Sequence, residues 1–295
     1  MSALIKRRQA GLLAGLGISV LLAKSARATG TAGAAAATAD PERALLDIDP
    51  TKFSRPTTID NRWLPLRPRT QLVYEGSVAE DGKRLAQRVV FTVTELVKTI
   101  NGMQVAIVHE TDIKDGKLEE QELIFFAQDD SGDLWHLGQI SEVYDEGQFA
   151  GGVAWMVGHL RGAKAGIIVQ ADPRPNTPSY SQGYAPPPYH WTDRGRVRRV
   201  GGNTTVPAGT FGPLLLVEEF SDTEPGAIQL KYYAQGVGLV RVGWAGDDPR
   251  REVLELVRVT QLGPEAMAEV HAEAFAIEGR AYVYASTAPA QRRAA

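Results

Sequence analysis

The stretch that decides the fold is residues 89–127, VVFTVTELVKTINGMQVAIVHETDIKDGKLEEQELIFFA. It contains Asn101-Gly102 and Asp115-Gly116, the dipeptides that two-residue hairpin turns favour because both turn positions adopt positive φ. Three consecutive antiparallel strands are therefore predicted. Apolar side chains fall on both faces of these strands, which indicates a curved sheet that is covered on both sides.

Counting outward from each turn predicts which residues lie opposite one another, and a slip of one residue would turn every side chain to the other face. From the first turn, the predicted pairs are Ile100 with Met103, Lys98 with Val105, Leu96 with Ile107 and Thr94 with His109. From the second turn, they are Ile113 with Leu118, Thr111 with Glu120, His109 with Glu122, Ile107 with Ile124 and Val105 with Phe126. This register brings Thr94, His109 and Glu122 together on one face.

The rest of residues 71–262 repeats the alternation of strands and turns, without the regularly spaced helices of a parallel α/β sheet. Further strands are expected near 134–138, 141–145, 153–157, 166–170, 197–206, 213–220, 227–234, 237–244 and 251–262. Residues 264–277 predict one amphipathic helix, because Pro264 suits a helix start and apolar residues recur at helical spacing. The predicted fold is mainly β: a single curved antiparallel sheet closing into a lipocalin-like barrel or half-barrel, with one C-terminal amphipathic helix.

Residues 231–244, KYYAQGVGLVRVGW, raise the alternative of a nucleotide-binding loop. A dinucleotide fingerprint needs a third glycine three residues on and a helix after it. Arg241 stands at that position, and strand-like residues surround it. The sequence therefore predicts a corner between two strands, in which Gly236 and Gly238 supply unusual backbone angles.

The first 28 residues have the pattern of an export signal: basic residues at 6–8, an apolar run over 10–23 and a small-residue cleavage site at 26–28. The apolar run is too short for a membrane span, and no second one follows, so no integral membrane span is expected. Arg7-Arg8 stands where a twin-arginine signal would have it. We therefore expect a periplasmic or secreted protein. The predicted organisation is an export signal at 1–28, a flexible linker at 29–50, a single β-rich domain at 51–280 and a disordered tail at 281–295.

The composition argues against several classes of partner and of catalytic chemistry. Removal of the signal takes away five basic and no acidic residues, so the formal net charge of −3 becomes about −8. Such a balance argues against nucleic acid and anionic membrane surfaces as partners. The chain has no cysteine, which excludes thiol catalysis, thiolate metal sites and disulfides.

Four segments together resemble a family of exported bacterial proteins: TTIDNRWLPLRPRTQLVYEG (57–76), AQDDSGDLWHLG (127–138), GIIVQADP (166–173) and KYYAQGVGLV (231–240). Members typically read TIDNPWFPLxPGTxWVYEG and YYAPGVGLV. The family has no assigned activity, so the resemblance implies export and a β-rich fold and transfers no catalytic residue. This chain departs from the pattern with His136 in place of an aromatic residue, Arg69 in place of a turn glycine and Gln235 in place of proline.

His109 and Glu122 form the predicted acid–base pair, since a cross-strand carboxylate orients an imidazole and raises its pKa. His136 is the third candidate catalytic residue, although the register does not fix which face it takes. The alternative is a structural polar pair at the rim of the sheet. The acidic run from Asp112 to Glu122 is interpreted as a solvated hairpin end, and His271 as a surface residue of the helix. A metal site from His109, His136 and His159 is a weaker hypothesis, and we expect neither a metal nor a cofactor.

The ligand-binding hypothesis rests on aromatic residues around the predicted concavity. Residues 172–191 are rich in Pro and Tyr and are long enough to form a lid. Three functions are considered: a container for a small apolar or amphipathic molecule, a cofactor-free hydrolase, lyase or isomerase that uses His109 and Glu122, or a structural envelope factor with no pocket. The candidate ligand-binding residues are Thr94, Trp135, Trp155, Tyr180, Tyr184 and Tyr189.

Overall fold

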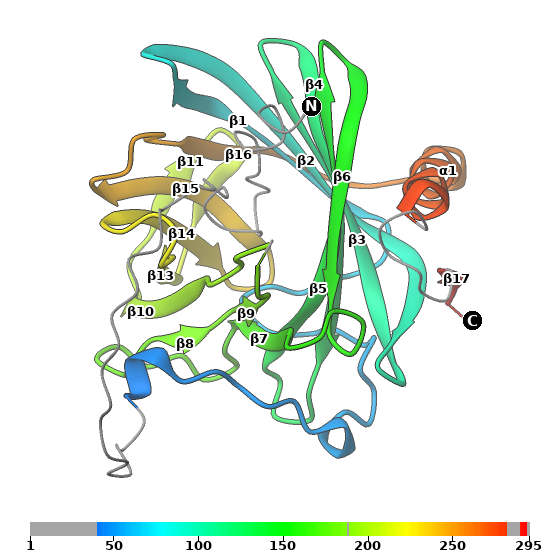
Figure 1. The fold of residues 1–295 in the computed structure, drawn as a ribbon. Helices are drawn as coiled ribbons and strands as arrows, with labels where there is room; N and C mark the ends of the chain where they lie inside the picture. Colours follow the sequence, from blue (N-terminus) through cyan, green and yellow to red (C-terminus); the bar gives the residue numbers. More distant parts are fainter. Residues whose placement is uncertain (1–39, 188, 282–289, 294–295) are drawn as a thin grey trace, which may run out of the picture.

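The computed structural model describes residues 40–187, 189–281 and 290–293. The predicted export signal, residues 29–39 of the linker and most of the predicted tail lie outside this part of the chain. One antiparallel sheet nearly closes into a barrel, and a helix lies against its outer surface (Figure 1). The predicted class, a mainly β protein with one curved antiparallel sheet and one helix near the C-terminus, is confirmed.

The elements of the described residues follow in chain order. The first strands in the chain are β1 (Thr70–Glu80), β2 (Lys83–Ile100), β3 (Met103–Lys114), β4 (Lys117–Gln128), β5 (Leu134–Asp145), β6 (Gln148–Met156) and β7 (Lys164–Val169). The next are β8 (Tyr180–Ser181), β9 (Gly183–Tyr184), β10 (Arg194–Val200), β11 (Thr204–Val206), β12 (Gly209–Phe211), β13 (Leu214–Phe220), β14 (Ala227–Ala234), β15 (Gly238–Gly246) and β16 (Val253–Gln261). The 3-10 helices η2 (Pro41–Arg43) and η3 (Pro50–Lys52) precede them, and α1 (Pro264–Ala281) and β17 (Gln291–Arg292) follow.

The sheet runs in the order β8-β10-β13-β14-β15-β16-β1-β2-β3-β4-β5-β7-β9, with β6 on β5 and β17 on β2. Its two ends are joined through the chain itself, because β8 and β9 are separated by Gln182 alone. Residues 172–191 therefore contribute strands to the wall of the barrel, where the sequence predicted a lid. The corner between β14 and β15 is confirmed, with φ of 74° at Gly236 and 112° at Gly238.

Both predicted hairpin turns are confirmed. Asn101-Gly102 has φ of 48° and 79°, and Asp115-Gly116 has φ of 46° and 79°. The pairs nearest the turns are also as predicted: Ile100 with Met103, Lys98 with Val105 and Ile113 with Leu118. Farther from the turns the predicted register is wrong, because each hairpin contains a bulge.

In β4, Leu118 pairs with Ile113 and Glu120 pairs with Asp112, so Glu119 is an extra residue. A bulge of this kind bends a strand and increases its twist, as closure of a barrel requires. Beyond it, His109 pairs with Leu123 and Glu122 pairs with Glu110.

A second bulge interrupts β2 between Val93 and Val97, where the predicted pairs Leu96 with Ile107 and Thr94 with His109 do not form. Thr94 fills this bulge: its hydroxyl donates to the Ile107 carbonyl at 2.7 Å and accepts from the Leu96 amide at 3.1 Å. β17 pairs with β2 in the same region, so residues 290–293 lie against the sheet, although a disordered tail was expected there.

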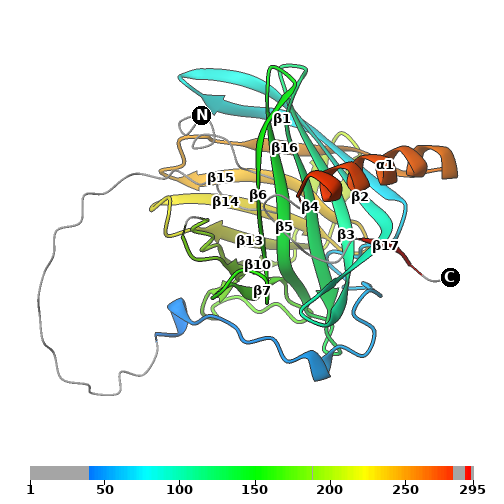
Figure 2. The same ribbon diagram turned by 45° about the vertical axis from the view of Figure 1, so that its right-hand side comes forward.

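Helix α1 packs across the outside of β2, β5 and β6 (Figure 2). The residues that it buries recur at helical spacing: Met267, His271, Ala274, Ile277 and Ala281. Two ion pairs fix the helix: Lys98 with Glu278 at 2.7 Å, and Arg280 with Glu142 at 2.6 Å. His271 is buried and accepts from the Glu95 amide at 3.2 Å, so its predicted surface position is wrong. Among the described residues, no helix combines the length and the hydropathy that crossing a membrane needs.

The segment that precedes β1 covers one end of the barrel. Ile59, Trp63, Leu64 and Leu66 are all buried in the core that it shares with the strands. The Asn61 side chain holds this segment in shape, because its carbonyl oxygen accepts from the amides of Trp63 and Leu64. This end of the interior is apolar and tightly packed.

Candidate functional site

The structure separates His109 from Glu122. Because His109 pairs with Leu123 and Glu122 with Glu110, the two side chains leave the sheet on opposite faces. His109 lies beneath α1, where its Nδ1 is 4.0 Å from a carboxylate oxygen of Glu273. Burial lowers its pKa to about 4, so the imidazole is neutral at neutral pH. The predicted pairing is wrong, and its cause is the extra residue Glu119.

Glu122 lies on the inward face, which we define as the face of β1–β5 opposite to α1. It is 1% exposed, and one carboxyl oxygen accepts from Gln139 Nε2 at 2.8 Å and from the Ser141 hydroxyl. Burial raises the pKa of Glu122 to about 7, and this effect outweighs the hydrogen bonds from Ser141 and Glu120, which act in the opposite direction. The carboxyl is therefore poised to exchange a proton near neutral pH.

Glu122 also shares a hydrogen bond with the side chain of Glu120. Two ionised carboxylates only accept hydrogen bonds, so a bond between two carboxyl groups requires a proton on one of them.

Two further carboxyl groups lie on the same face of neighbouring β3. We call Glu110, Asp112, Glu120 and Glu122 the acidic wall; each is between 1% and 4% exposed. Burial raises the pKa of Asp112 to about 6, opposed by the charge of Lys114 and reinforced by that of Glu252. The run from Asp112 to Glu122 was expected from the sequence to be a solvated hairpin end, and the burial of Asp112, Glu120 and Glu122 shows that this expectation is wrong. The sequence does contain a signal for this wall: Glu110 and Asp112, like Glu120 and Glu122, are two residues apart and therefore share a face of their strand.

Three buried glutamines repeat one arrangement in the interior. Gln87 donates its amide N–H to Asp112 at 3.0 Å, Gln139 donates to Glu122 at 2.8 Å, and Gln229 donates to Glu252 at 2.7 Å. In each case the carbonyl oxygen of the glutamine is buried and has no hydrogen-bond partner among the described residues. The second carboxyl oxygen of Glu122 also has no hydrogen-bond partner among the described residues.

The opposite wall of the barrel carries a buried ion pair. Lys231 Nζ on β14 lies 3.5 Å from Glu219 on β13, and both side chains are at most 2% exposed. Gln182, at the closure of the barrel, donates to the other oxygen of Glu219 at 2.9 Å. Burial together with the charge of Glu219 raises the pKa of Asp193 well above its usual value.

His136 takes the inward face, since it pairs with Phe126 as Ser141 pairs with Glu122. Its ring is surrounded by aromatic rings, with centroids 4.9 Å from Trp155, 5.7 Å from Trp191 and 5.7 Å from Phe126. Nδ1 lies 3.3 Å from the Gln182 carbonyl, and burial lowers the pKa of the imidazole to about 4. His136 is therefore a neutral member of an aromatic cluster beside Gln139, the cross-strand neighbour of Trp155.

The predicted ligand-binding residues divide into three groups. Trp155 and Tyr180 are buried on the inner side, where Tyr180 lies over Gly195 near Glu219. Thr94 fills the β2 bulge, and Trp135 is on the outer face, donating to Asp129 at 3.0 Å. The two remaining tyrosines lie in or near the closing segment: Tyr184 is part of β9, and the hydroxyl of Tyr189 accepts from the Ala154 amide.

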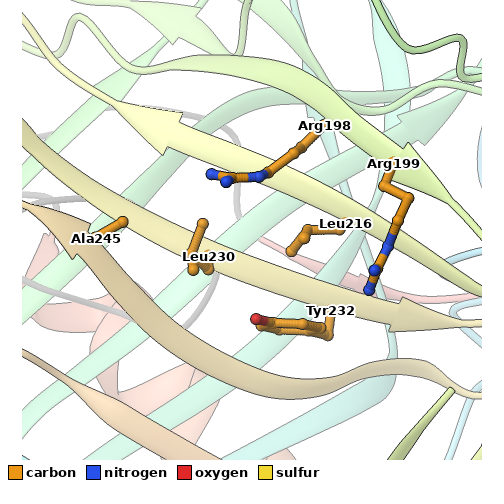
Figure 3. A pocket seen from close by; sticks show the side chains of 6 residues that line it. All are labelled: Arg198, Arg199, Leu216, Leu230, Tyr232 and Ala245. Carbon is orange, nitrogen blue, oxygen red and sulfur yellow. The ribbon is translucent and has the colours of Figure 1, made fainter. Parts of the chain in front are cut away.

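Two of the surface hollows formed by the described residues lie outside the barrel interior, and neither was expected from the sequence. One, of about 450 Å³, lies on the outer face of β10, β13, β14 and β15 (Figure 3) and is lined by Arg198, Arg199, Leu216, Leu230, Tyr232 and Ala245. The other, of about 520 Å³, lies between the segment before β1, the β11–β12 hairpin and β16, and includes Arg67, Phe211 and Arg258. Among the described residues, no group of three or more His, Asp or Glu side chains is arranged to hold a metal ion.

Comparisons with known proteins establish no family. No family model matches the sequence, and no curated protein matches it. Two solved structures are similar over 68% of this chain and 99% of their own: a provisionally named exported protein with a YmcC-like fold from Bacteroides fragilis NCTC 9343 (TM-score 0.40, 11% identity) and a provisionally named lipoprotein from Parabacteroides distasonis ATCC 8503 (TM-score 0.39, 14% identity). At these values the likeness carries no inference about function.

Proposed function

We propose that this chain is a periplasmic or secreted protein that binds a small amphipathic molecule against the inward face of its barrel. The observation that carries the proposal is the set of buried acceptor oxygens on Gln87, Gln139, Gln229 and Glu122 that have no hydrogen-bond partner in the part of the chain that the structure describes. An unpartnered buried polar atom costs about 1–3 kcal/mol, so several of them on the inner walls indicate a partner from outside the chain.

The proposed ligand is amphipathic because the inward face has an apolar, aromatic end and an acidic end. Phe91 and Tyr74 lie on this face next to the packed apolar end, and Glu110 pairs directly with Phe91. A ligand that lies along the strands therefore meets aromatic rings at one end and the acidic wall at the other. Small-molecule sites typically combine such an apolar lining with a few polar groups.

The cellular location in this proposal rests on residues 1–28, which have the basic, apolar and small-residue regions of an export signal. Export by the twin-arginine route is part of the proposal, and Arg7-Arg8 supports it. A protein exported in this way folds before it crosses the membrane. It could therefore carry a ligand that was loaded in the cytoplasm.

Native mass spectrometry of the protein purified from its own cell envelope tests the proposal. We expect a retained adduct that is displaced when the protein is unfolded and refolded. Glu122→Gln is expected to reduce the adduct, and the exposed control Glu269→Gln is expected to retain it. A mass equal to that of the bare polypeptide in every preparation would contradict the proposal.

The hydrogen-bonded pair of Glu120 and Glu122 favours a second candidate, a cofactor-free hydrolase, lyase or isomerase. A carboxyl group whose pKa lies near 7 is suited to general acid–base work at neutral pH. In this version Glu122 transfers the proton and His109, beneath α1, takes no part. Turnover should then be lost in Glu122→Gln and survive in His109→Ala, whereas the reverse result would restore His109 to the mechanism.

A further inference from the structure

We propose that the hollow on the outer face of β10, β13, β14 and β15 binds a small amphipathic monocarboxylate, in chemical class a medium-chain fatty acid. Its carboxylate would lie against Arg199, and its aliphatic chain would lie on the floor formed by Leu216, Leu230 and Tyr232. This site is outside the barrel, so the inference does not depend on the ligand proposed for the interior and goes beyond the proposed function.

The hollow has the size of a small-molecule site and lies on an open face of the sheet. Its volume of about 450 Å³ falls within the range of about 300–1,000 Å³ that is usual for ligand pockets. Helix α1 covers β2, β5 and β6, on the far side of the barrel from this hollow (Figure 1). A ligand can therefore reach the hollow from solvent without any movement of the helix.

The strand register places a cation at each end of an apolar row. Arg199 on β10 pairs with Leu216 on β13, and Leu216 pairs with Tyr232 on β14. Tyr232 in turn pairs with Arg241 on β15. Directly opposite residues share a face of an antiparallel sheet, so these side chains lie side by side across three strand spacings, or about 14 Å at about 4.8 Å per spacing. An elongated ligand along this row meets a guanidinium first and then apolar side chains.

The charges around the hollow leave one cation over. The other arginines of β10, and the one at the far end of the row, each have an acceptor partner: Arg194 with Ser179, Arg196 with Glu42, Arg198 with Glu218, and Arg241 with Glu255. Arg199 has no hydrogen bond and no ion pair within the part of the chain that the structure describes. The hollow therefore presents one positive charge that a ligand can neutralise.

Small residues on β15 keep the apolar floor accessible. Leu216 is 6% exposed, and Leu230 and Tyr232 are half-buried, so the floor is made of side chains that already pack against one another. Gly243 pairs with Leu230, and a Cβ at this position would lie 3.8 Å from Tyr232 and 3.9 Å from Leu230. Because glycine lacks that atom, room is left beside both side chains for the chain of a ligand.

A single unpaired guanidinium favours a carboxylate over a more highly charged headgroup. Arginine presents its N–H donors in a planar fork that matches the two oxygens of a carboxylate. A phosphate monoester carries about 1.5 to 2 negative charges, more than Arg199 alone neutralises. Figure 3 shows Arg198 and Arg199 extending from β10 over the hollow, with Leu216 between them. A carboxylate at Arg199 thus has its apolar chain directed onto the floor.

The alternative is that these arginines only keep the β10 edge from pairing with other chains, as charges on edge strands do. Among the described residues, β8 pairs with β10 only at Arg194 and Gly195, so the rest of β10 is an edge on that side. Edge protection, however, needs charges that project past the edge. Arg199 instead points across the sheet toward Tyr232 (Figure 3).

Isothermal titration calorimetry with decanoate, below the concentration at which it forms micelles, tests this inference. The comparators at matched ionic strength are acetate, decan-1-ol, decyltrimethylammonium and decyl phosphate. We expect decanoate to bind at least about tenfold more tightly than each of them, because only decanoate combines a single negative charge with an apolar chain. Added salt should weaken the binding, since the charge of Arg199 is exposed to solvent.

Five variants locate the site. Arg199→Gln should lower the decanoate affinity by about tenfold, the equivalent of about 1.4 kcal/mol. Gly243→Val and Ala245→Leu fill the hollow and should lower it at least as much. Gly243→Val should fold, because φ at Gly243 lies outside the left-handed region and valine suits a strand. Arg258→Gln, in the second surface hollow, and Glu122→Gln, in the barrel, should leave the affinity unchanged.

Each contrary result has a definite meaning. Loss of binding in Arg258→Gln and not in Arg199→Gln would place the ligand in the second hollow and overturn the inference. Loss in Glu122→Gln alone would place decanoate inside the barrel, which overturns the inference and supports the proposed function. Equal affinities for acetate and decanoate, or tighter binding of decyl phosphate, would overturn the assigned ligand class. Absence of decanoate binding overturns the inference and leaves the proposed function, which the retained adduct tests, standing.

Discussion

Glu122→Gln should stabilise the protein at alkaline pH, even though it removes a buried group with three hydrogen-bonding neighbours. Glutamine has the size of glutamate, and its carbonyl oxygen can still accept from Gln139 and Ser141. Glutamine lacks the titrating carboxyl group. In Glu122, burial raises the pKa of that group from 4.5 to about 7. At about 1.4 kcal/mol per pKa unit, ionising Glu122 inside the folded protein costs about 3 kcal/mol more than in the unfolded chain.

The sign of the pH dependence follows from where the proton binds more tightly. Because the pKa of Glu122 is higher in the folded state, the folded protein holds this proton at pH values where the unfolded chain has lost it. The stability of the parent protein should therefore fall as the pH rises from about 4.5 to about 7 and then level off. The raised pKa of Asp112 acts in the same direction, up to about pH 6, in parent and variant alike.

Urea denaturation at pH values from about 5 to about 8, followed by circular dichroism, measures this difference. Glu122→Gln should match the parent protein near pH 5 and exceed its free energy of unfolding by about 3 kcal/mol near pH 8. The control Glu269→Gln changes an exposed helix residue and should stay within about 0.5 kcal/mol of the parent at every pH. A variant that is less stable than the parent at pH 8, with equal stability at pH 5, would refute the reasoning.

Three further substitutions test the packing of the barrel by the same denaturation assay. Gly76→Ala should cost more than about 3 kcal/mol, because its Cβ would lie 1.8 Å from a β16 carbonyl oxygen. The control Gly263→Ala should be tolerated, because its Cβ would face open space. Equal effects of the two substitutions would contradict the close approach of β1 and β16. Lys98→Met should cost about 3–5 kcal/mol by leaving Glu278 buried without its partner. Adding Glu278→Leu should recover most of that loss, and an unchanged stability of Lys98→Met would show that the ion pair is dispensable. Thr94→Val should cost about 1–3 kcal/mol, since it removes both hydrogen bonds that fill the β2 bulge, and an unchanged stability would show that water replaces them.

Much of the fold can be predicted from sequence because it is set by local chemistry. Asn101-Gly102 and Asp115-Gly116 specify their turns through positive φ, which few other residue pairs adopt at low cost. Pro264 and the apolar spacing after it specify a helix in the same local way. These signals lie within a few residues of the feature that they determine, so a single sequence suffices to find them.

The candidate site could not be predicted in the same way, because bulges depend on tertiary closure. Nothing in the run LEEQE from Leu118 to Glu122 marks Glu119 as the extra residue, since the bulge follows from the bend that the barrel imposes on β4. A shift of one residue was enough to exchange His109 for Glu110 as the partner of Glu122. The acidic run from Asp112 to Glu122 was therefore assigned to a solvated hairpin end, and the imidazole of His109 to the same face as Glu122.

Deleting Glu119 discriminates between the two registers. In the structure Leu118 pairs with Ile113 and Glu120 with Asp112, so removing Glu119 closes the bulge and leaves every other pair in place. We expect the deletion variant to fold, at a cost of about 1–2 kcal/mol for the lost bend, and to keep the pH-dependent stability that Glu122 confers. In a hairpin without a bulge, the same deletion would turn Glu120, Glu122 and every residue beyond them to the other face, and the protein should unfold.

Deleting Leu123 is the matched control. The chain can absorb this loss only by using Glu119 to fill the gap, which turns Glu120 and Glu122 toward α1, or by turning the rest of β4 over. Either response buries carboxyl groups against the helix or apolar side chains against the acidic wall, so we expect this variant not to fold. If instead the Glu119 deletion unfolds the protein and the Leu123 deletion does not, the inward position of Glu122 is wrong, and the container and the enzyme hypotheses both lose their site.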